Sequence, residues 1–226
     1  MSEPLTATDL GRMPYREALA FQREAVLSRA RGEIPDTVYF VEHDPVLTVG
    51  RAGRSESLRA DPSELKRRGI EVFDVERGGD VTYHGPGQAV AYPIVSLADL
   101  PGGRDLHRYL RDLEEVLIRA LEAFGIAATR RPPYTGVWVG DRKVAAIGVA
   151  IRQWVAFHGF ALNVDPDLGH FELIHPCGIR GAGIASMRTL LGAAPARDQV
   201  LERLCTAFGD VWQRPVLAPL GAMLHV

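Results

Sequence analysis

Residues 77–88 form a glycine-rich stretch that carries several side chains able to do chemistry, and they read RGGDVTYHGPGQ. Four glycines and one proline among these twelve residues exclude a regular helix. Glycine also lets the backbone approach a ligand closely. Arginine, tyrosine, histidine and glutamine side chains on such a loop more often serve binding or catalysis than packing. The stretch therefore indicates a ligand site.

Cys177 is the candidate nucleophile. It lies between Pro176 and Gly178 in the segment HPCGIRG, where no regular element can form. A free thiol titrates near ~8.5, and a neighbouring cation such as Arg180 favours the thiolate. Three interpretations remain open from this context: a nucleophile, an inert loop cysteine or a metal ligand. Cys205 lies in a predicted helix, where we expect a small buried hydrophobe.

Lys143 and His84 are the other candidates. Lys143 follows a predicted turn at residues 140–142 and precedes an apolar run. It is either an edge-strand lysine that extends to water or a pocket lysine that stabilises a thiolate or moves a proton. His84 is either a loop histidine bonded to backbone or a pocket residue that the surrounding glycines expose to a ligand. With Cys177, these residues suggest an acyl-handling pocket.

Metal and nucleotide sites have weaker support. His158, His170, His175 and Cys177 lie within twenty residues and are ligand types that zinc accepts. Their spacing matches no familiar zinc pattern, so we predict no metal. The sequence contains no G-x-x-x-x-G-K-[ST] loop, no strand-linked G-x-G-x-x-G and no G-x-S-x-G elbow. The missing motifs argue against the common nucleotide-binding loops, but ATP use by another architecture stays open.

The elements that must position these residues follow from hydrophobic spacing and turn residues. Helices are predicted from about Tyr15 to Leu27 and over 62–68, 105–124 and 197–208. Strands are predicted over 37–41, 46–49, 71–75, 90–95, 136–139, 143–151 and 154–164. Pro93 suggests that its strand is an edge or contains a bulge.

This order predicts an α+β type of α/β fold, with mixed, mostly antiparallel sheets and flanking helices. We expect residues 1–226 to form one large α/β domain. A small C-terminal appendage from about residue 196 is also compatible with the pattern.

Composition restricts the classes of partner. The net charge of −2 gives no general attraction to nucleic acid or to an anionic membrane. Basic residues cluster at 51–68 and 104–111, either as solvated faces or as a docking surface for an acidic protein. The chain has two cysteines, no secretory leader and no apolar run of membrane-spanning length. We therefore expect a cytoplasmic protein with reduced thiols.

Four blocks of sequence together resemble the lipoyl(octanoyl) transferases. They are Arg77–Gln88, Lys143 with Ala146-Ile147-Gly148, the segment HGFALN at 158–163, and PCGI at 176–179. The blocks occur in the family's order and span at least Glu42 to Met187, about two thirds of the chain. The first block is highly specific, and the others are strong in combination.

The resemblance implies a domain related to biotin and lipoate protein ligases, with Cys177 as nucleophile and Lys143 as its catalytic partner. It also implies an acyl site lined by Arg77, Gly78, Gly79, Asp80, Val81, Thr82, Tyr83, His84, Ala146, Ile147, Gly148, Gly159, Phe160 and Ala161. The implied donor is octanoyl-acyl carrier protein. The implied acceptors are lipoyl domains of 2-oxoacid dehydrogenase E2 subunits and the glycine cleavage H protein.

Transfer from a thioester to an amine is downhill, so we expect no ATP and no other cofactor. An octanoyl-Cys177 intermediate would allow one pocket to serve two protein substrates in turn. Backbone amides near Cys177 or at Gly78-Gly79 are both candidates for stabilising the oxyanion. Burial of the acyl chain would contribute about 0.8 kcal/mol per methylene.

The chain departs from the family's usual pattern at two positions. His43-Asp44-Pro45 stands where His-Pro-Pro is common, which is a turn and should be harmless. Ala185-Ser186 stands where Thr-Ser is common, so a hydroxyl role there would depend on Ser186 alone.

Three rival functions remain. An ATP-dependent lipoate or biotin ligase would need ATP but not Cys177. A non-catalytic protein that binds acyl groups or lipoyl domains would tolerate loss of Cys177 and Lys143. A cysteine hydrolase would release octanoate to water.

Overall fold

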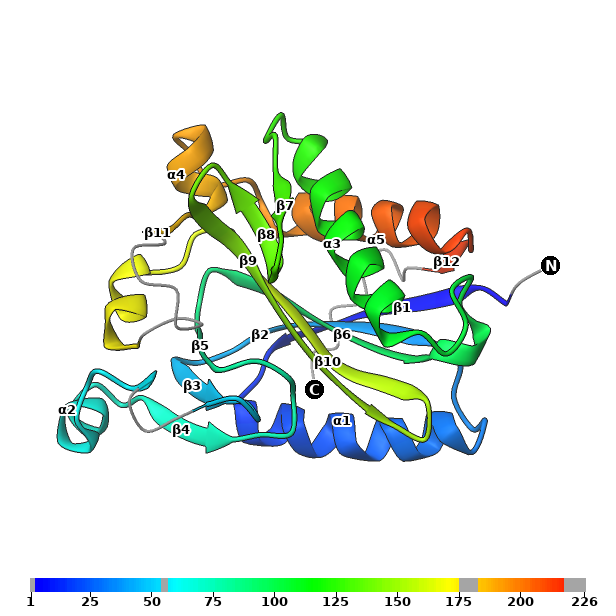
Figure 1. The fold of residues 1–226 in the computed structure, drawn as a ribbon, viewed down its shortest axis with the longest axis horizontal. Helices are drawn as coiled ribbons and strands as arrows, with labels where there is room; N and C mark the ends of the chain where they lie inside the picture. Colours follow the sequence, from blue (N-terminus) through cyan, green and yellow to red (C-terminus); the bar gives the residue numbers. More distant parts are fainter. Residues whose placement is uncertain (1–2, 54–56, 175–182, 218–226) are drawn as a thin grey trace.

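The centre of the molecule is a long mixed β-sheet (Figure 1). The computed structural model describes residues 3–53, 57–174 and 183–217. Within them the sheet has nine strands. Its main path runs through β12 (Val216–Leu217), β1 (Leu5–Arg12), β2 (Thr37–Glu42), β6 (Gln88–Ser96), β10 (Val155–Asn163), β9 (Arg142–Arg152), β8 (Tyr134–Val139) and β7 (Thr129–Arg131), and β11 (Gly183–Ile184) pairs with β9.

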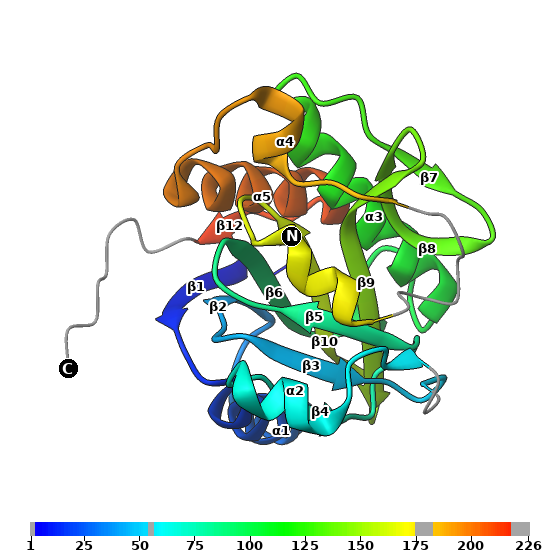
Figure 2. The ribbon, with the colours of Figure 1, turned by 90° about the vertical axis from the view of Figure 1, so that its left-hand side faces the viewer.

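A second, three-stranded sheet lies beside the long one (Figure 2). Its order is β4 (Glu71–Asp74), β3 (Val46–Val49) and β5 (Val81–His84). The turn at 43–45, predicted to join two strands, carries the chain from β2 in the first sheet to β3 in the second. The glycine-rich loop at 77–80 joins β4 to β5, and helix α2 (Pro62–Arg67) lies at the outer side of this sheet.

Helices cover both faces of the long sheet (Figure 1). Helix α1 (Tyr15–Ala30) packs against β6 and β10 on one face. Helices α3 (Leu106–Glu122) and α5 (Arg197–Trp212) pack together on the other face, and the short α4 (Met187–Leu191) precedes α5. Two 3₁₀ turns, η2 (Leu97–Asp99) and η3 (Leu168–Leu173), complete the described elements.

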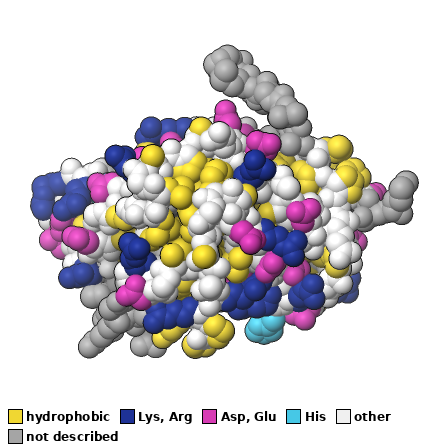
Figure 3. Space-filling view, turned by 90° about the horizontal axis from the view of Figure 1, so that it is seen from above, with side chains coloured by type: hydrophobic (Ala, Val, Ile, Leu, Met, Phe, Trp, Pro, Cys, Tyr) yellow, Lys and Arg dark blue, Asp and Glu magenta, His cyan; other side chains and the backbone are white. Residues whose placement is uncertain are grey.

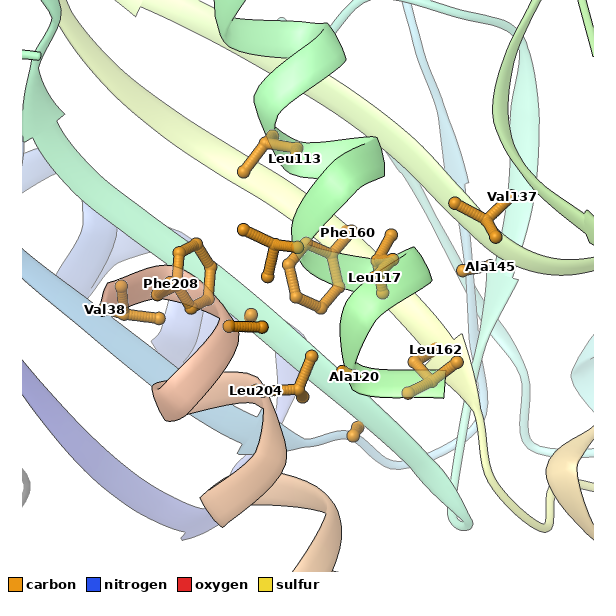
Figure 4. Packing of buried hydrophobic residues seen from close by; sticks show 14 of the residues in the cluster. Val38, Leu113, Leu117, Ala120, Val137, Ala145, Phe160, Leu162, Leu204 and Phe208 are labelled. Atoms are coloured by element: carbon orange, nitrogen blue, oxygen red, sulfur yellow. The ribbon is translucent and has the colours of Figure 1, made fainter. Parts of the chain in front are cut away.

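The main core lies between the sheet and helices α3 and α5 (Figure 4). Phe160 of β10 stacks on Phe208 of α5 with 6.0 Å between ring centroids. Leu113 and Leu117 of α3 are fully buried beside them. Each such side chain contributes about 1.5–3 kcal/mol on burial. Helix α5 therefore shares one core with α3 and the central strands.

The predicted α+β fold is confirmed, but the sequence pattern missed β1, β5, β7, β11 and β12, and the suggestion of an edge at Pro93 was wrong. The sequence LTATDLGR at 5–12 was not predicted as a strand, and it forms β1 between β2 and β12. Pro93 does not mark an edge, since β6 lies in the middle of the sheet between β2 and β10. Paired positions of β6 and β10 are interrupted opposite Pro93, so the proline's missing amide breaks no regular ladder there.

Candidate active site

The glycine-rich loop attaches to β9. The amide of Gly78 donates to the carbonyl of Val149 at 2.8 Å. A Cβ at Gly148 would come within 2.9 Å of the Gly78 carbonyl oxygen, so only a glycine there admits the loop without a shift. The structure thus brings together two predicted groups of acyl-site residues, Arg77–Gly79 and Ala146–Gly148.

The Arg77 side chain is buried and ties this loop to the small sheet. Its Nη2 donates to the carbonyl of Thr48 at 2.6 Å and to Thr48 Oγ1 at 2.8 Å, while Nη1 donates to the Gly78 carbonyl at 3.0 Å. These charge-assisted bonds fix the loop against β3. Arg77 therefore contributes to the site as a buried anchor.

Lys143 is buried on β9, with 7% of its surface exposed. Its Nζ donates to the Thr135 carbonyl at 3.3 Å and lies 4.9 Å from the centroid of the Trp138 ring. The strand is paired on both sides at this residue, with Trp138 of β8 and Ile184 of β11. The interpretation of Lys143 as an edge lysine extending to water is therefore wrong.

The described segment that follows Cys177 in the sequence begins with β11, which lies beside Lys143. The amide of Ala185 donates to the Lys143 carbonyl at 2.9 Å. Asn163 Nδ2 donates to the Ala185 carbonyl at 3.0 Å, and Asn163 Oδ1 accepts from Gln88 Nε2 at 2.9 Å. The predicted nucleophile Cys177 lies outside the described residues, but the first strand after it is attached directly to the strand of Lys143.

The hydroxyl of Ser186 has a structural use. It accepts from the Thr189 amide at 3.2 Å, and the Ser186 amide donates to Thr189 Oγ1 at 3.0 Å. This reciprocal pair forms a capping box at the start of α4. The residue for which a hydroxyl role was considered is therefore a helix cap.

His84 lies at the end of β5 and is buried against other aromatic rings, whereas both predictions placed it on a loop. Its ring stacks on Tyr15 and lies 6.0 Å from His43. Burial is the main reason why the pKa of His84 lies well below its ordinary value, and the same cause lowers the pKa of His43 to about 4. His43 Nδ1 bonds the Met13 carbonyl, which can only accept, so Nε2 accepts from the Tyr92 hydroxyl at 2.6 Å.

His158 lies opposite the attachment point of the loop. It pairs with Val149 in register, has a φ of 55° and donates its amide to Gln22 Oε1 at 2.9 Å. Burial lowers the pKa of His158 to about 4, although Glu76 lies 3.8 Å from its Nε2. Glu76 also forms a bidentate ion pair with Arg23, and this pair lines a cavity of about 200 Å³ between α1 and the end of β9.

The other predicted acyl-site residues divide between two faces of the long sheet. Phe160 and Ile147 pack into the main core on the side of α3 and α5. Ala161 packs on the opposite side with Ala18 of α1 and with residues of β2 and β6, and Ala146 is its register partner on β9. A Cβ at Gly159 would come within 2.1 Å of the Ala91 carbonyl oxygen, so that glycine permits close strand packing.

Strand β5 supplies the last predicted group. Val81 and Tyr83 are buried in the smaller core, and Thr82 pairs with Thr48 of β3. Asp80 Oδ1 accepts from the Val81 amide at 2.7 Å, which orders the end of the loop. Burial raises the pKa of Tyr83 to about 12. These contacts hold β5 and the loop as one unit facing β9.

Comparisons with known proteins identify relatives that match most of this chain. The family model described as the lipoyl protein ligase A/B catalytic domain matches residues 14–209. An octanoyltransferase of Rubrobacter xylanophilus is 49% identical over 221 residues, covering 95% of this chain and 98% of the relative. An octanoyltransferase of Chloroflexus aurantiacus is 46% identical over 211 residues, covering 92% and 94%.

The chain belongs to the octanoyltransferase family.

Solved structures show the fold that this octanoyltransferase family member shares with ligases. A lipoate-protein ligase A bound with ATP has a TM-score of 0.77 at 19% identity, covering 96% of this chain and 88% of the ligase. A biotin protein ligase from Aquifex aeolicus has a TM-score of 0.53 at 12% identity, covering 94% and 70%. At such identities the likeness concerns the fold alone.

Sequence reasoning missed several buried polar residues of this octanoyltransferase family member. Gln88 and Asn163 lay within the quoted motifs but received no role. Tyr92 lies in a largely apolar strand, and Gln22 lies on the buried face of α1 among apolar residues such as Ala18, Ala25 and Val26. A polar residue at an inward-facing position was the available signal. Their hydrogen bonds join residues far apart in the sequence, which no local pattern predicts.

Both basic clusters contain arginines that pair with acids of their own helix, such as Arg68 with Glu64 at 2.6 Å at the C-terminal end of α2. Arg108 pairs with Asp112 at 2.7 Å and Arg111 with Glu114 at 2.8 Å, so much of the charge on α3 is neutralised locally. Figure 3 shows basic and acidic side chains interspersed around a hydrophobic patch on the upper side of the molecule. Lys66 and Arg67 on α2 belong to the other cluster, part of which lies outside the described residues.

The structure places two of the four residues considered as zinc ligands, His158 and His170. His158 faces Glu76, His170 lies beside Asp167, and His175 and Cys177 are outside the described residues. Among described residues, no group of three or more His, Cys, Asp or Glu side chains is placed to hold a metal ion. None of the described helices has the length and apolar character to span a membrane.

Cys205 is half-buried on α5 against the core, and burial raises its pKa to about 11.

Proposed function

We propose that this protein transfers an octanoyl or lipoyl group from the thioester of acyl carrier protein to a lysine of a lipoyl domain, the first step of endogenous protein lipoylation. The observation that carries the proposal is the buried Lys143, whose backbone carbonyl holds the residue that follows β11, only a few positions after Cys177. The octanoyltransferases with 44–49% identity support the same reaction.

In the first half-reaction, the Cys177 thiolate attacks the thioester carbonyl. A carbon–sulfur bond to Cys177 forms and the bond to the carrier thiol breaks. The departing thiolate takes a proton from the Lys143 ammonium, which leaves octanoyl-Cys177 and a neutral Lys143 amine. A cation beside Cys177 favours its thiolate before the attack.

In the second half-reaction, the ε-amine of the acceptor lysine attacks octanoyl-Cys177. The amide bond forms, the bond to Cys177 breaks and Lys143 accepts the proton from the attacking amine. Cys177 returns as thiolate and Lys143 as ammonium, so the cycle closes without ATP. The Arg77–Gly79 loop, Ala146 and Gly148 would line the pocket for the acyl chain. Ala161 would add apolar surface to this pocket.

We infer that the acceptors are lipoyl domains of 2-oxoacid dehydrogenase E2 subunits and the glycine cleavage H protein. A cytoplasmic location agrees with a reactive thiol that must stay reduced. We also propose that the chain acts as one catalytic domain, because α5 shares the main core with α3 and with β10.

A transfer assay tests this function against the ligase alternative. Octanoyl-carrier protein and a lipoyl domain are mixed with wild type, Cys177→Ala or the control Cys205→Ala, with and without ATP. The proposal predicts ATP-independent transfer by wild type and Cys205→Ala, and none by Cys177→Ala. Transfer that requires free octanoate and ATP would place the protein among the ligases, and release of octanoate without an acceptor would make it a hydrolase.

A further inference from the structure

Glu114 is a fully buried carboxylate on helix α3, which packs against β8 and against β9, the strand of Lys143. Its Oε1 accepts a hydrogen bond from the Gly136 amide at 3.0 Å. Its Oε2 lies 2.8 Å from Arg111 Nη1 and 3.2 Å from Arg130 Nε, without hydrogen-bond geometry, so these are charge contacts. A buried carboxylate is costly unless such partners stabilise its charge.

The Gly136 amide belongs to the same peptide group as the Thr135 carbonyl, to which Lys143 Nζ donates at 3.3 Å. Glu114 and Lys143 therefore bind opposite ends of one peptide unit. A carboxylate that accepts from a peptide N–H polarises the group and makes its carbonyl oxygen a better acceptor. The buried charge thus strengthens and orients the bond that holds the Lys143 ammonium.

The backbone at this peptide is specialised for the contact. Gly136 has a φ of 127°, which side chains rarely permit. A Cβ there would come within 2.8 Å of the Ala145 carbonyl oxygen and 3.3 Å of Lys143 Cε. Glycine leaves the space in which the lysine stem lies. The peptide can then present its carbonyl to Nζ and its amide to α3.

A purely structural role accounts for only half of these contacts. The arginine contacts of Oε2 would join α3 to β7 whatever the direction of Oε1. Oε1, however, points to the peptide bound by Lys143, in a part of β8 that also supplies Trp138 beneath the ammonium. The geometry of both oxygens is explained if the carboxylate holds this peptide for the lysine.

We propose that Glu114 is a positioning residue for Lys143. Its carboxylate fixes the Thr135–Gly136 peptide, and this peptide sets where the Lys143 ammonium lies and how readily it gives and receives a proton. The inference rests on the proposed catalytic role of Lys143. It adds a residue on α3 to a site otherwise built from the two sheets and their loops.

The test is a double-mutant cycle on ATP-independent transfer. Glu114→Gln keeps the shape but replaces an ionic acceptor with a neutral one, and charged hydrogen bonds are roughly twice as strong. We expect kcat to fall about tenfold with KM for the carrier donor unchanged, equivalent to about 1.4 kcal/mol in the barrier. In the Lys143→Ala background, Glu114→Gln should then cause almost no further loss.

Arg111→Gln is the matched control, since it removes a charge contact of Glu114 while leaving the Gly136 bond in place. It should lower the unfolding free energy like Glu114→Gln without lowering kcat to the same extent. If Glu114→Gln does not fold, Glu114→Asp retains the charge but draws it back by one methylene, and the same cycle applies.

The outcomes separate the two proposals. If the separate losses of kcat caused by Glu114→Gln and Lys143→Ala multiply in the double variant, Glu114 does not act through Lys143, and this inference is overturned. An unchanged kcat in Lys143→Ala would instead overturn the role of Lys143 in the proposed function, and this inference with it. A KM effect alone in Glu114→Gln would also overturn it.

Discussion

The Lys143 carbonyl accepts a hydrogen bond from the Ala185 amide at 2.9 Å. This bond connects the strand of the proposed base with the strand that follows Cys177 in the chain. Asn163 reinforces it from β10 by donating to the Ala185 carbonyl at 3.0 Å. The first described segment after the proposed nucleophile is thus attached to the strand of the proposed base.

Replacing Asn163 by alanine should therefore reduce transfer more than its effect on folding explains. The change removes the Asn163 donor to the Ala185 carbonyl and one acceptor of Gln88 Nε2, which also donates to the Tyr83 carbonyl at 3.3 Å. A buried group left unpaired costs about 1–3 kcal/mol. Urea unfolding measures that cost, and kcat measures the effect on the site. Val200→Ala, a buried change on α5, is the stability control. Equal kcat in the two folded variants would limit Asn163 to a structural role.

Gly148→Ala should be destabilising, whereas Gly78→Ala should be tolerated by the fold. The added Cβ at residue 148 would meet the Gly78 carbonyl oxygen at 2.9 Å and Arg77 Cδ at 3.0 Å. At residue 78 the nearest atom, the Val149 carbonyl oxygen, is an ordinary 3.7 Å away. Overpacking costs about 1–3 kcal/mol, so urea midpoints should separate the two variants. Identical midpoints would refute the proposed close fit of the loop on β9.

The buried histidines should make the protein less stable as the pH falls. Burial lowers the pKa of His43 and His158 from 6.5 to about 4, so the unfolded chain takes up their protons first. Their stabilising contribution is complete above about pH 6.5, declines as the pH falls below that value and is lost once the pH has fallen through about 4. Each should account for about 2 kcal/mol lost between pH 7.5 and pH 5.

The measurement is the free energy of unfolding as a function of pH. His43→Gln should flatten the curve in this window, although it lowers stability overall. His107→Gln, which alters an exposed histidine on α3, should leave the slope unchanged. A wild-type curve that is flat between pH 7.5 and pH 5 would contradict the neutral, buried state of these rings.

Local patterns in the sequence were sufficient for most elements of this fold. The Asp61 cap and Pro62 predict α2, and the leucine spacing after Asp105 predicts α3. β1 was missed because LTATDLGR mixes polar residues with few apolar ones, and its pairing partners lie far away in the sequence. Strand order likewise depends on long-range pairing, which local propensity does not determine.

The candidate site could be predicted from the sequence only in part. Glycine-rich spacing indicated the loop, and the structure supplies the reason for Gly148, which is the approach of the Gly78 carbonyl. One of the two predictions for His84 had the flanking glycines expose it to a ligand, whereas Tyr15 and His43 pack beside its ring. Such packing comes from α1 and from the turn after β2, so it could not be read from the residues around His84.

Intact-protein mass spectrometry tests the central claim most directly. The enzyme is mixed with octanoyl-carrier protein in the absence of ATP and acceptor, and the adduct is mapped by peptide digestion. The account predicts one octanoyl group on Cys177, absent from Cys177→Ala, retained in Cys205→Ala and discharged when a lipoyl domain is added. No adduct on wild type, with acylation of the lipoyl domain appearing only when octanoate and ATP are supplied, would contradict it.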